Sequence, residues 1–299
     1  ICLNVVDEVP DSLGKPQFNN LDMAKCDMVI GPLMRENVAI AAPRIDRFGR
    51  EHVLLTEQPA HHVERGGAVR QAVASEVAAT HMLADLIASR HDTDHVMLVV
   101  TGASDAVLEQ AFEAEFNAAQ RSKWQTPQDS LRYALLDTVQ ADARSVGRLA
   151  DHVSPYKRNV VVSVAGRSAR SMWAALQTEL QMNDSSDFVL FAHPELAEMP
   201  FVEGRLMEKW RLTLPLTNQI QWQDSLRWEG LEDFRLRMAT EPQKYAVLAH
   251  DAMLDAGLRR HPWLNVHSWT NPMVWDTLGT SGAWSNVSWS LKRFENLQW

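Results

Sequence analysis

The sequence predicts a two-lobed α/β protein, in which each lobe is a doubly wound, mainly parallel sheet flanked by helices. Residues 28–55 read as a strand, a helix and a second strand joined by short connections, which is the pattern of a parallel crossover. From Val96 to Phe191, strand-like and helix-like segments alternate regularly, as in a sheet covered on both faces. A chain of 299 residues is long enough for two such lobes.

The crossover begins with an apolar run, Met28–Ile30, that stops at Gly31-Pro32. A helical pattern follows, and Pro43 inside it predicts that the helix ends or kinks near Ala42, because proline cannot donate the i→i−4 hydrogen bond. A second apolar run at 53–55 ends in a polar loop. Both strands therefore end on one edge of the sheet, where open α/β sheets bind their ligands.

The other elements follow from the same periodicities. Residues 1–6 read as a strand, residues 60–67 as a polar loop and residues 69–89 as a long helix. Further strands are expected at 96–100, 132–136, 159–164, 187–191, 211–216 and 285–294. Further helices are expected at 105–120, 141–153, 168–180, 225–239 and 242–258.

Composition and charge exclude some classes of partner. The formal net charge is −9 and no basic run offers a footprint for phosphates, which argues against nucleic acid. No run of about eighteen apolar residues occurs, so the sequence predicts no transmembrane helix. The chain begins at Ile1, inside a predicted strand, so the lack of a targeting segment carries no conclusion.

The two cysteines, Cys2 and Cys26, each lie near the start of an early strand-like run. The second and third strands of a doubly wound sheet usually flank the first, which does not favour a bridge between them. Two interpretations stay open at this point: a disulfide, or two buried thiols.

The order of these elements resembles that of type I periplasmic binding proteins, the fold of branched-chain amino-acid receptors and of LysM-associated envelope proteins. Ile30-Gly31-Pro32-Leu33 resembles the end of the family's strand, and residues 240–246, followed by Asp251, resemble its return to the first lobe. The resemblance implies a first lobe of residues 1–95 plus 212–262 and a second lobe of residues 96–211 plus 263–299. It also implies that the first lobe lacks the family's first strand and helix in this chain.

The resemblance places a ligand between the lobes, held by loops at the carboxyl ends of strands. Glu195 matches the acidic residue that holds the ligand amine, and Thr56 keeps one hydroxyl of the loops that hold the ligand carboxylate. Arg35 and Arg167 suit an anion, and Ser168 opens a predicted helix. The alternatives are surface charges for the arginines, an N-cap for Ser168 and a solvated carboxylate for Glu195. The candidate ligand-binding residues are Arg35, Asn37, Thr56, Asp105, Arg167, Ser168 and Glu195.

Neither metal nor catalytic chemistry is expected. His61-His62 and the connector from His91 to His95 contain metal-capable side chains, but side chains on so short a connector can diverge. The sequence contains no nucleophile elbow, Walker A loop, dinucleotide fingerprint or zincin motif. We therefore expect no cofactor, no metal and no enzymatic activity.

Tryptophan is concentrated late in the chain. Nine of the eleven tryptophans lie from Trp210 onward, and several fall in the loop-rich stretch from His261 to Trp284. Core packing explains some of them. Exposed members suit a protein interface better than a platform for sugars, because indole combines apolar area with a polar handle.

Two hypotheses for function follow, both placing the chain in the periplasm or cell envelope, including association with the outer membrane. One is an interaction or scaffold module of an envelope complex, like the lipoproteins and peptidoglycan-linked LysM proteins that share the fold. The alternative is a receptor that delivers an amino acid or small peptide to an ABC transporter. The replaced hydroxyls at 34–37 and the Trp-rich tail favour the scaffold.

Overall fold

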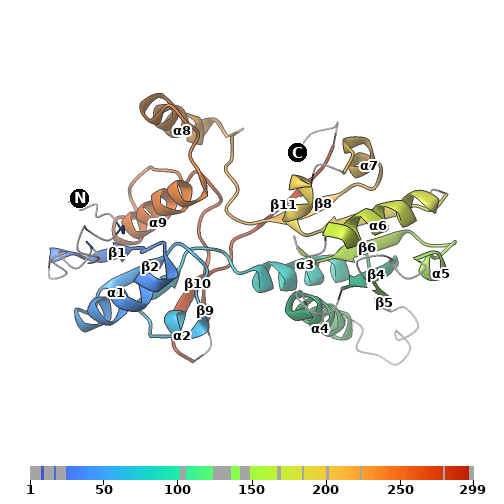
Figure 1. The fold of residues 1–299 in the computed structure, drawn as a ribbon, viewed down its shortest axis with the longest axis horizontal. Coiled ribbons are helices and arrows are strands. Elements are labelled where there is room, and N and C mark those ends of the chain that lie inside the picture. The colour runs from blue at the N-terminus through green and yellow to red at the C-terminus, as the bar shows by residue number, and fades with distance from the viewer. Residues whose placement is uncertain are drawn as a thin grey trace. The chain divides into compact units, whose positions relative to one another are not determined.

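The structure is a computed structural model that describes residues 8–9, 17, 25–101, 106–123, 136–141, 149–166, 170–183, 185–199, 202–222, 224–278 and 280–295. The chain divides into two compact units, each a mainly parallel sheet with helices on its faces (Figure 1). Unit 1 comprises Ile1–Ser75 and Thr217–Trp289, and unit 2 comprises Glu76–Leu216 and Ser290–Trp299. The predicted fold class, with two mainly parallel α/β lobes, is confirmed.

Unit 1 contains a five-stranded sheet of order β1-β2-β3-β10-β9. All neighbours are parallel except the edge strand β9, which runs antiparallel to β10. The strands are β1 (Met28–Ile30), β2 (Glu51–Leu54), β3 (Val69–Gln71), β9 (Trp275–Leu278) and β10 (Ala283–Asn286). The helices are α1 (Arg35–Arg47), α2 (Ala60–Val63), α8 (Ser225–Met238) and α9 (Lys244–Arg260).

Alternation along β2 explains why helices cover both faces of this sheet. Leu54 packs with Val38 of α1 in one buried cluster. Its neighbour Val53 packs with Leu248 of α9 in another. Successive side chains of a strand point to opposite faces, so one short apolar strand supplies both cores, and Figure 1 shows α1 and α9 on opposite sides of β2.

Unit 2 contains a six-stranded sheet of order β11-β8-β7-β6-β4-β5, in which only the edge strand β11 is antiparallel. Its strands are β4 (His95–Val100), β5 (Leu136–Gln140), β6 (Asn159–Ser163), β7 (Phe188–Ala192), β8 (Thr213–Leu216) and β11 (Ser290–Arg293). Its helices are α3 (Glu76–Arg90), α4 (Ala106–Lys123), α5 (Leu149–His152), α6 (Arg170–Met182), the 3₁₀ helix η5 (Pro194–Glu198) and α7 (Gly204–Lys209).

The central strands of unit 2 are buried on both faces. Every residue of β6 and β7 is buried, as expected for parallel strands covered on both sides. Met97 and Val99 of β4 join the largest buried cluster together with α6. Helices α3 and α4 pack together on the other side of the sheet from α6 (Figure 1).

The division of the chain differs from the expected lobes in three segments. Residues 212–216 belong to unit 2, because β8 pairs with β7 and β11. Residues 76–95 belong to unit 2, because α3 packs along α4. Residues 263–289 belong to unit 1, because β10 pairs with β3 and β9 pairs with β10. Strand pairing between segments that are distant in the sequence, β10 with β3 and β11 with β8, accounts for two of these differences.

The helix after β1 continues past the expected break. Of the two predicted effects of Pro43, an end of the helix near Ala42 is wrong, because α1 runs to Arg47 with Pro43 inside it. Pro43 and Ala39 both lie on the exposed side of α1, so water can satisfy the carbonyl that loses its i→i−4 partner. The buried side, with Val38 and Ile45, holds the helix on the sheet.

Several element boundaries also need correction. The helix expected from residue 69 begins at Glu76, because Val69–Gln71 pairs with β2 as strand β3. The strand expected at 285–294 is two strands in different sheets, β10 and β11, and the loop at 60–67 contains α2. Of the strand expected at 132–136, only Leu136 lies within the described residues, where it is the first residue of β5 (Leu136–Gln140).

Two further expectations fall partly or wholly outside the described residues. These are the strand at 1–6 and most of the helix at 141–153, of which α5 is the described part. Among the helices of the described segments, none combines the length and the apolar character needed to cross a bilayer.

Candidate functional site

The first candidate region lies in unit 1, at the carboxyl ends of β1 and β2. Gly31 follows β1 with a φ of 90°, a conformation that side chains other than hydrogen rarely permit. Its amide donates to the carbonyl of Val53 at 2.9 Å. The turn at Gly31 directs residues 32–34 along the sheet edge and into the first turn of α1.

A carboxylate from elsewhere in unit 1 occupies the start of α1. The Leu33 amide donates a short hydrogen bond to Glu8 Oε1, and the Met34 amide donates to Oε2 at 2.9 Å. Asn37 Nδ2 lies 3.4 Å from Oε2 and 3.3 Å from the Glu8 carbonyl. Free N–H groups and the helix dipole make the start of a helix a favourable place for an anion, and Glu8 supplies that anion. We call Glu8, Leu33, Met34 and Asn37 the Glu8 cradle.

Two of the predicted site residues meet at this edge, but through internal contacts. Asn37 is 8% exposed and bonds to Glu8. Thr56 Oγ1 donates to the Leu33 carbonyl at 3.1 Å and accepts from Gln58 Nε2 at 2.6 Å. Arg35 lies on the exposed side of α1. The side chains of Asn37 and Thr56 therefore stabilise the loop at residues 33–34 through hydrogen bonds within the chain.

A buried histidine supports the same turn from beneath. His52 of β2 is fully buried, with Nε2 2.8 Å from the Gly31 carbonyl and Nδ1 2.5 Å from Arg65. Arg65 also pairs with Asp46 at 2.5 Å. Burial, and then the positive charge of Arg65, lower the pKa of His52 to about 4. The ring is therefore neutral at pH 7, with Nε2–H donating to Gly31 and Nδ1 accepting from Arg65.

The second candidate region lies in unit 2, at the carboxyl ends of β6 and β7. His193 Nδ1 accepts from the Glu195 amide at 3.3 Å and caps η5. A Cβ placed on Gly166 would lie 3.1 Å from Glu195 Oε2, so the carboxylate rests against the backbone that follows β6. His193 Nε2 is 3.8 Å from Glu76 Oε1. Glu195 thus lies half-buried at the predicted edge.

Three of the other predicted site residues, Asp105, Arg167 and Ser168, lie outside the described residues. The same holds for Cys2, and with it for the question of a bridge to Cys26, which is half-buried.

The side chains of the connector from His91 to His95 bind different partners. His91 Nδ1 pairs with Asp94 at 2.7 Å, whereas Asp92 pairs with Lys123 at 2.7 Å. His95 Nε2 lies 2.8 Å from the carbonyl of His152. In the part of the chain that the structure describes, no three His, Cys, Asp or Glu side chains are placed to hold a metal ion.

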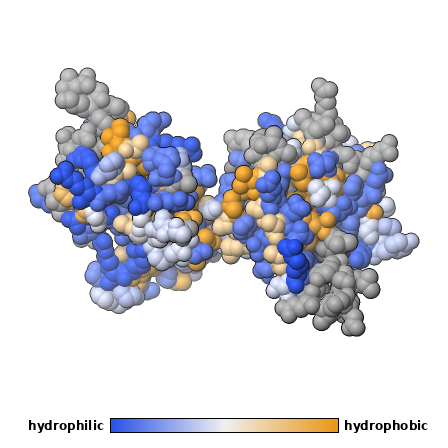
Figure 2. All heavy atoms as spheres, turned by 90° about the horizontal axis from the view of Figure 1, so that it is seen from below, coloured by the Kyte–Doolittle hydropathy of each residue, from blue (hydrophilic) through white to orange (hydrophobic). Residues whose placement is uncertain are grey.

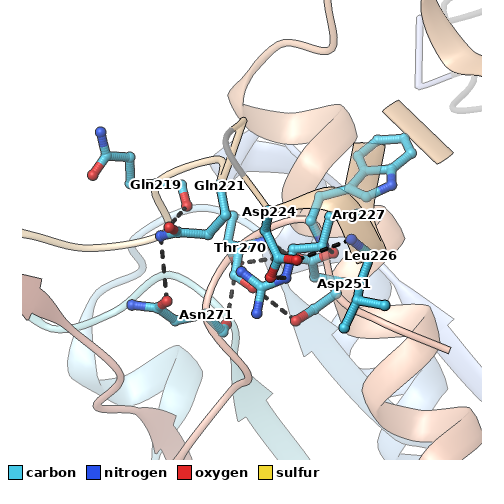
Figure 3. A network of polar contacts seen from close by, with 10 residues as sticks. Gln219, Gln221, Asp224, Leu226, Arg227, Asp251, Thr270 and Asn271 are labelled. Carbon is cyan, nitrogen blue, oxygen red and sulfur yellow. Dashed lines mark hydrogen bonds and ion pairs between the residues drawn. The ribbon is translucent and has the colours of Figure 1, made fainter. Parts of the chain in front are cut away.

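A polar network in unit 1 ties the late loops to α8 and α9 (Figure 3). Asp251 of α9 is 1% exposed. It accepts from the Trp269 amide at 2.8 Å, the Thr270 amide at 2.9 Å and the Thr270 hydroxyl at 2.6 Å. Its Oδ1 also lies 2.8 Å from His250 Nδ1. A buried carboxylate needs such donors, so Asp251 serves structure and not ligand binding.

The late tryptophans divide into buried and exposed members. Trp269 is 7% exposed and stacks on His250 with ring centroids 3.7 Å apart. Trp263, by contrast, is 75% exposed, and its neighbours Leu264 and Val266 are exposed as well. All of residues 261–267 lie at the surface of unit 1. We call residues 261–267 the Trp263 loop.

No protein-family model and no curated protein match the sequence. Solved structures do match. LpoA from Haemophilus influenzae is 12% identical, with a TM-score of 0.55 over 92% of this chain and 48% of LpoA. An ABC transporter substrate-binding protein from Desulfitobacterium hafniense in complex with Leu is 16% identical, with a TM-score of 0.56 over 92% of this chain and 80% of that protein.

A branched-chain amino acid ABC transporter periplasmic ligand-binding protein from Burkholderia xenovorans is 10% identical, with a TM-score of 0.51 over 78% of this chain and 60% of that protein. The chain has the fold of type I periplasmic binding proteins. The resemblance predicted from the sequence is therefore confirmed at the level of the fold. The chain spans about half the length of LpoA.

Proposed function

We propose that this chain is a non-catalytic interaction module of a cell-envelope complex, which uses the type I periplasmic-binding-protein fold to hold another envelope protein. A place in the periplasm or envelope is supported by the proteins that share the fold, which include a periplasmic ligand-binding protein. Attachment to the outer membrane or to peptidoglycan, as a lipoprotein or through a LysM partner, belongs to the same proposal.

The observation that carries the proposal is the Glu8 cradle. In the receptors that the sequence resembles, this edge of the first lobe holds the ligand carboxylate with hydroxyls and backbone N–H groups. Here the amides of Leu33 and Met34 already bind the Glu8 carboxylate. Thr56, the remaining hydroxyl, is bound to Leu33 and Gln58. A free amino acid would have to displace an internal carboxylate before it could bind here.

The Trp263 loop offers a surface for the partner. Trp263 is 75% exposed and Leu264 is 42% exposed, side by side in a loop of exposed residues. Exposed aromatic and aliphatic side chains in a cluster are typical of protein interfaces. Figure 2 shows hydrophobic residues reaching the surface of the molecule among hydrophilic ones.

Thermal unfolding of the protein against a panel of amino acids, short peptides and wall fragments tests the proposal. A ligand that binds only the folded state must raise the midpoint. We expect no rise for the wild type at millimolar concentrations. A rise for Glu8→Ala alone would support an internally filled cradle. Glu36→Ala, which removes a carboxylate from the first turn of α1, is the matched control.

Crosslinking of the protein to isolated envelopes tests whether the Trp263 loop binds a partner protein. We expect Trp263→Ala to lose a specific crosslinked product that Trp228→Ala retains, because Trp228 is also exposed but lies on α8. Equal yields from both variants and the wild type would remove the Trp263 loop from the proposal.

The second candidate, a solute receptor for an amino acid or small peptide, is favoured by the position of Glu195. Its carboxylate rests on Gly166 at the edge where the resemblance places the residue that binds the ligand amine. A midpoint rise in the wild type that Glu195→Gln abolishes would establish this receptor and overturn the scaffold proposal.

A further inference from the structure

A cavity in unit 2 lies away from the edge that carries Glu195. Its volume is about 310 Å³. Its rim gathers near the amino ends of the parallel strands: Arg158 directly precedes β6 and Arg211 precedes β8 by two residues. Arg293 of the antiparallel β11 pairs with Thr213, the first residue of β8. The volume falls within the range of small-molecule sites.

The floor of this cavity is apolar. Val189 and Phe191 project from one face of β7, and Leu291 projects from the neighbouring edge of the sheet. Leu86 of α3 closes one side. The ring of His91 meets Phe191 edge to face, with centroids 5.6 Å apart. These side chains offer an apolar surface to a ligand of aliphatic or aromatic character.

The rim is basic, with guanidinium groups from separate segments of the chain. Arg158 and Arg211 share the carboxylate of Asp187, at 3.0 Å and 3.6 Å. Arg293 Nε lies 3.3 Å from Glu295 Oε1. The fourth, Arg90, lies at the exposed end of α3, and within the described residues no carboxylate pairs with it.

The charged groups around the cavity carry a surplus of positive charge. Four guanidinium groups line it, those of Arg90, Arg158, Arg211 and Arg293. Among the described residues, three acidic groups pair with its lining: Asp187, Glu295, and Asp94, which pairs with His91. These groups include one more guanidinium than carboxylate, and Arg90 is the guanidinium that pairs with none of the described carboxylates. Guanidinium forms forked hydrogen bonds with carboxylates, which are stronger than neutral ones.

We propose that this cavity binds a small organic carboxylate, whose apolar body lies on Val189, Phe191 and Leu291 and whose single negative charge meets Arg90. The apolar floor selects against small inorganic anions, and the basic rim selects against neutral or cationic molecules of the same shape. This site is independent of the Glu8 cradle, so it goes beyond the proposed function and does not depend on it.

Isothermal titration calorimetry of the full chain with octanoate tests the proposal. We expect saturable binding to the wild type and about tenfold weaker binding to Arg90→Gln, because one charge-assisted hydrogen-bonding group is lost. Arg47→Gln is the matched control, since Arg47 is also an exposed arginine in the last turn of a helix but lies in unit 1. Its affinity should equal that of the wild type.

Two probes and one spectroscopic readout complete the test. Octan-1-ol and octylammonium share the apolar body but lack the carboxylate, and we expect neither to bind. Octanoate should also shift the methyl resonances of Val189 and Leu291, which line the cavity. The proposal is overturned by no heat of binding with octanoate, by equal binding of octan-1-ol, by equal weakening in Arg47→Gln, or by methyl resonances that do not move.

Discussion

The charged groups at the Glu8 cradle, at His52 and at Asp251 in unit 1 differ in their partners from those around the cavity of unit 2. In unit 1, Glu8, His52 and Asp251 each have partners within the chain, and His52 and Asp251 are almost fully buried. In unit 2, the cavity rim holds more guanidinium than carboxylate groups, and Arg90 faces solvent. A charge with internal partners stabilises the fold, whereas a charge without them remains available to a ligand. Stability measurements on matched variants test this difference between the units.

The largest effect is expected at Asp251. Asp251→Ala leaves the buried amides of Trp269 and Thr270 without their acceptor and removes the shorter hydrogen bond of the Thr270 hydroxyl. The free energy of unfolding should therefore fall by about 4 kcal/mol. Denaturant unfolding followed by tryptophan fluorescence measures the change. Asp233→Ala is the control, because its pair with Arg237 is exposed and should contribute less than about 1 kcal/mol. Similar losses for both variants would contradict the structural role of Asp251.

His52 predicts a dependence of stability on pH. The folded pKa is about 4 and the ordinary value is 6.5, so below pH 6.5 the unfolded chain binds a proton that the folded chain excludes. Stability should therefore fall by about 3 kcal/mol between pH 6.5 and pH 4. Denaturant unfolding of wild type and His52→Gln over this range gives the contribution by difference. His267→Gln, in the exposed Trp263 loop, should keep the wild-type dependence; identical profiles for all three proteins would exclude the buried neutral His52.

A smaller effect is expected in the Glu8 cradle. Glu8→Ala removes the acceptor for the amides of Leu33 and Met34, and because water can reach this edge the cost should be about 2 kcal/mol. Chemical denaturation measures it. Glu36→Ala, in the same helical turn, should cost less than about 0.5 kcal/mol. An unchanged free energy of unfolding for Glu8→Ala would mean that this carboxylate contributes nothing to the stability of the fold.

The smallest effect is expected in unit 2. Arg90→Gln removes a guanidinium that has no carboxylate partner among the described residues, so stability should change by less than about 0.5 kcal/mol. The same denaturant experiment checks this. A loss of 2 kcal/mol or more would place Arg90 among the structural charges, and the contrast between the units would fail.

The parts of the fold that follow from local periodicity could be predicted. The crossover from β1 through α1 to β2 was recognisable because each segment shows its own apolar pattern. Strand β3 was not, because its three residues are defined by pairing with β2 and β10 on either side. The late segment looked like one strand, and only its partners β3 and β8, far away in sequence, show that it is two.

The candidate sites show the same limit. Asn37 and Thr56 were predicted at the sheet edge because each lies within a few residues of the end of a strand. Glu8 was missed, since it meets Leu33 across 25 positions of sequence and carries no local signal. The basic cavity was missed for the same reason, because its arginines come from segments that only the folded sheet brings together.

Amide hydrogen exchange at Leu33 and Met34 shows whether Glu8 fills the cradle in the folded protein. If Glu8 fills the cradle, both amides are protected in the wild type, leucine at millimolar concentration leaves their exchange unchanged, and Glu8→Ala exposes them. Fast exchange of both amides in the wild type, or protection that leucine increases, would contradict an internally filled cradle and favour the solute receptor.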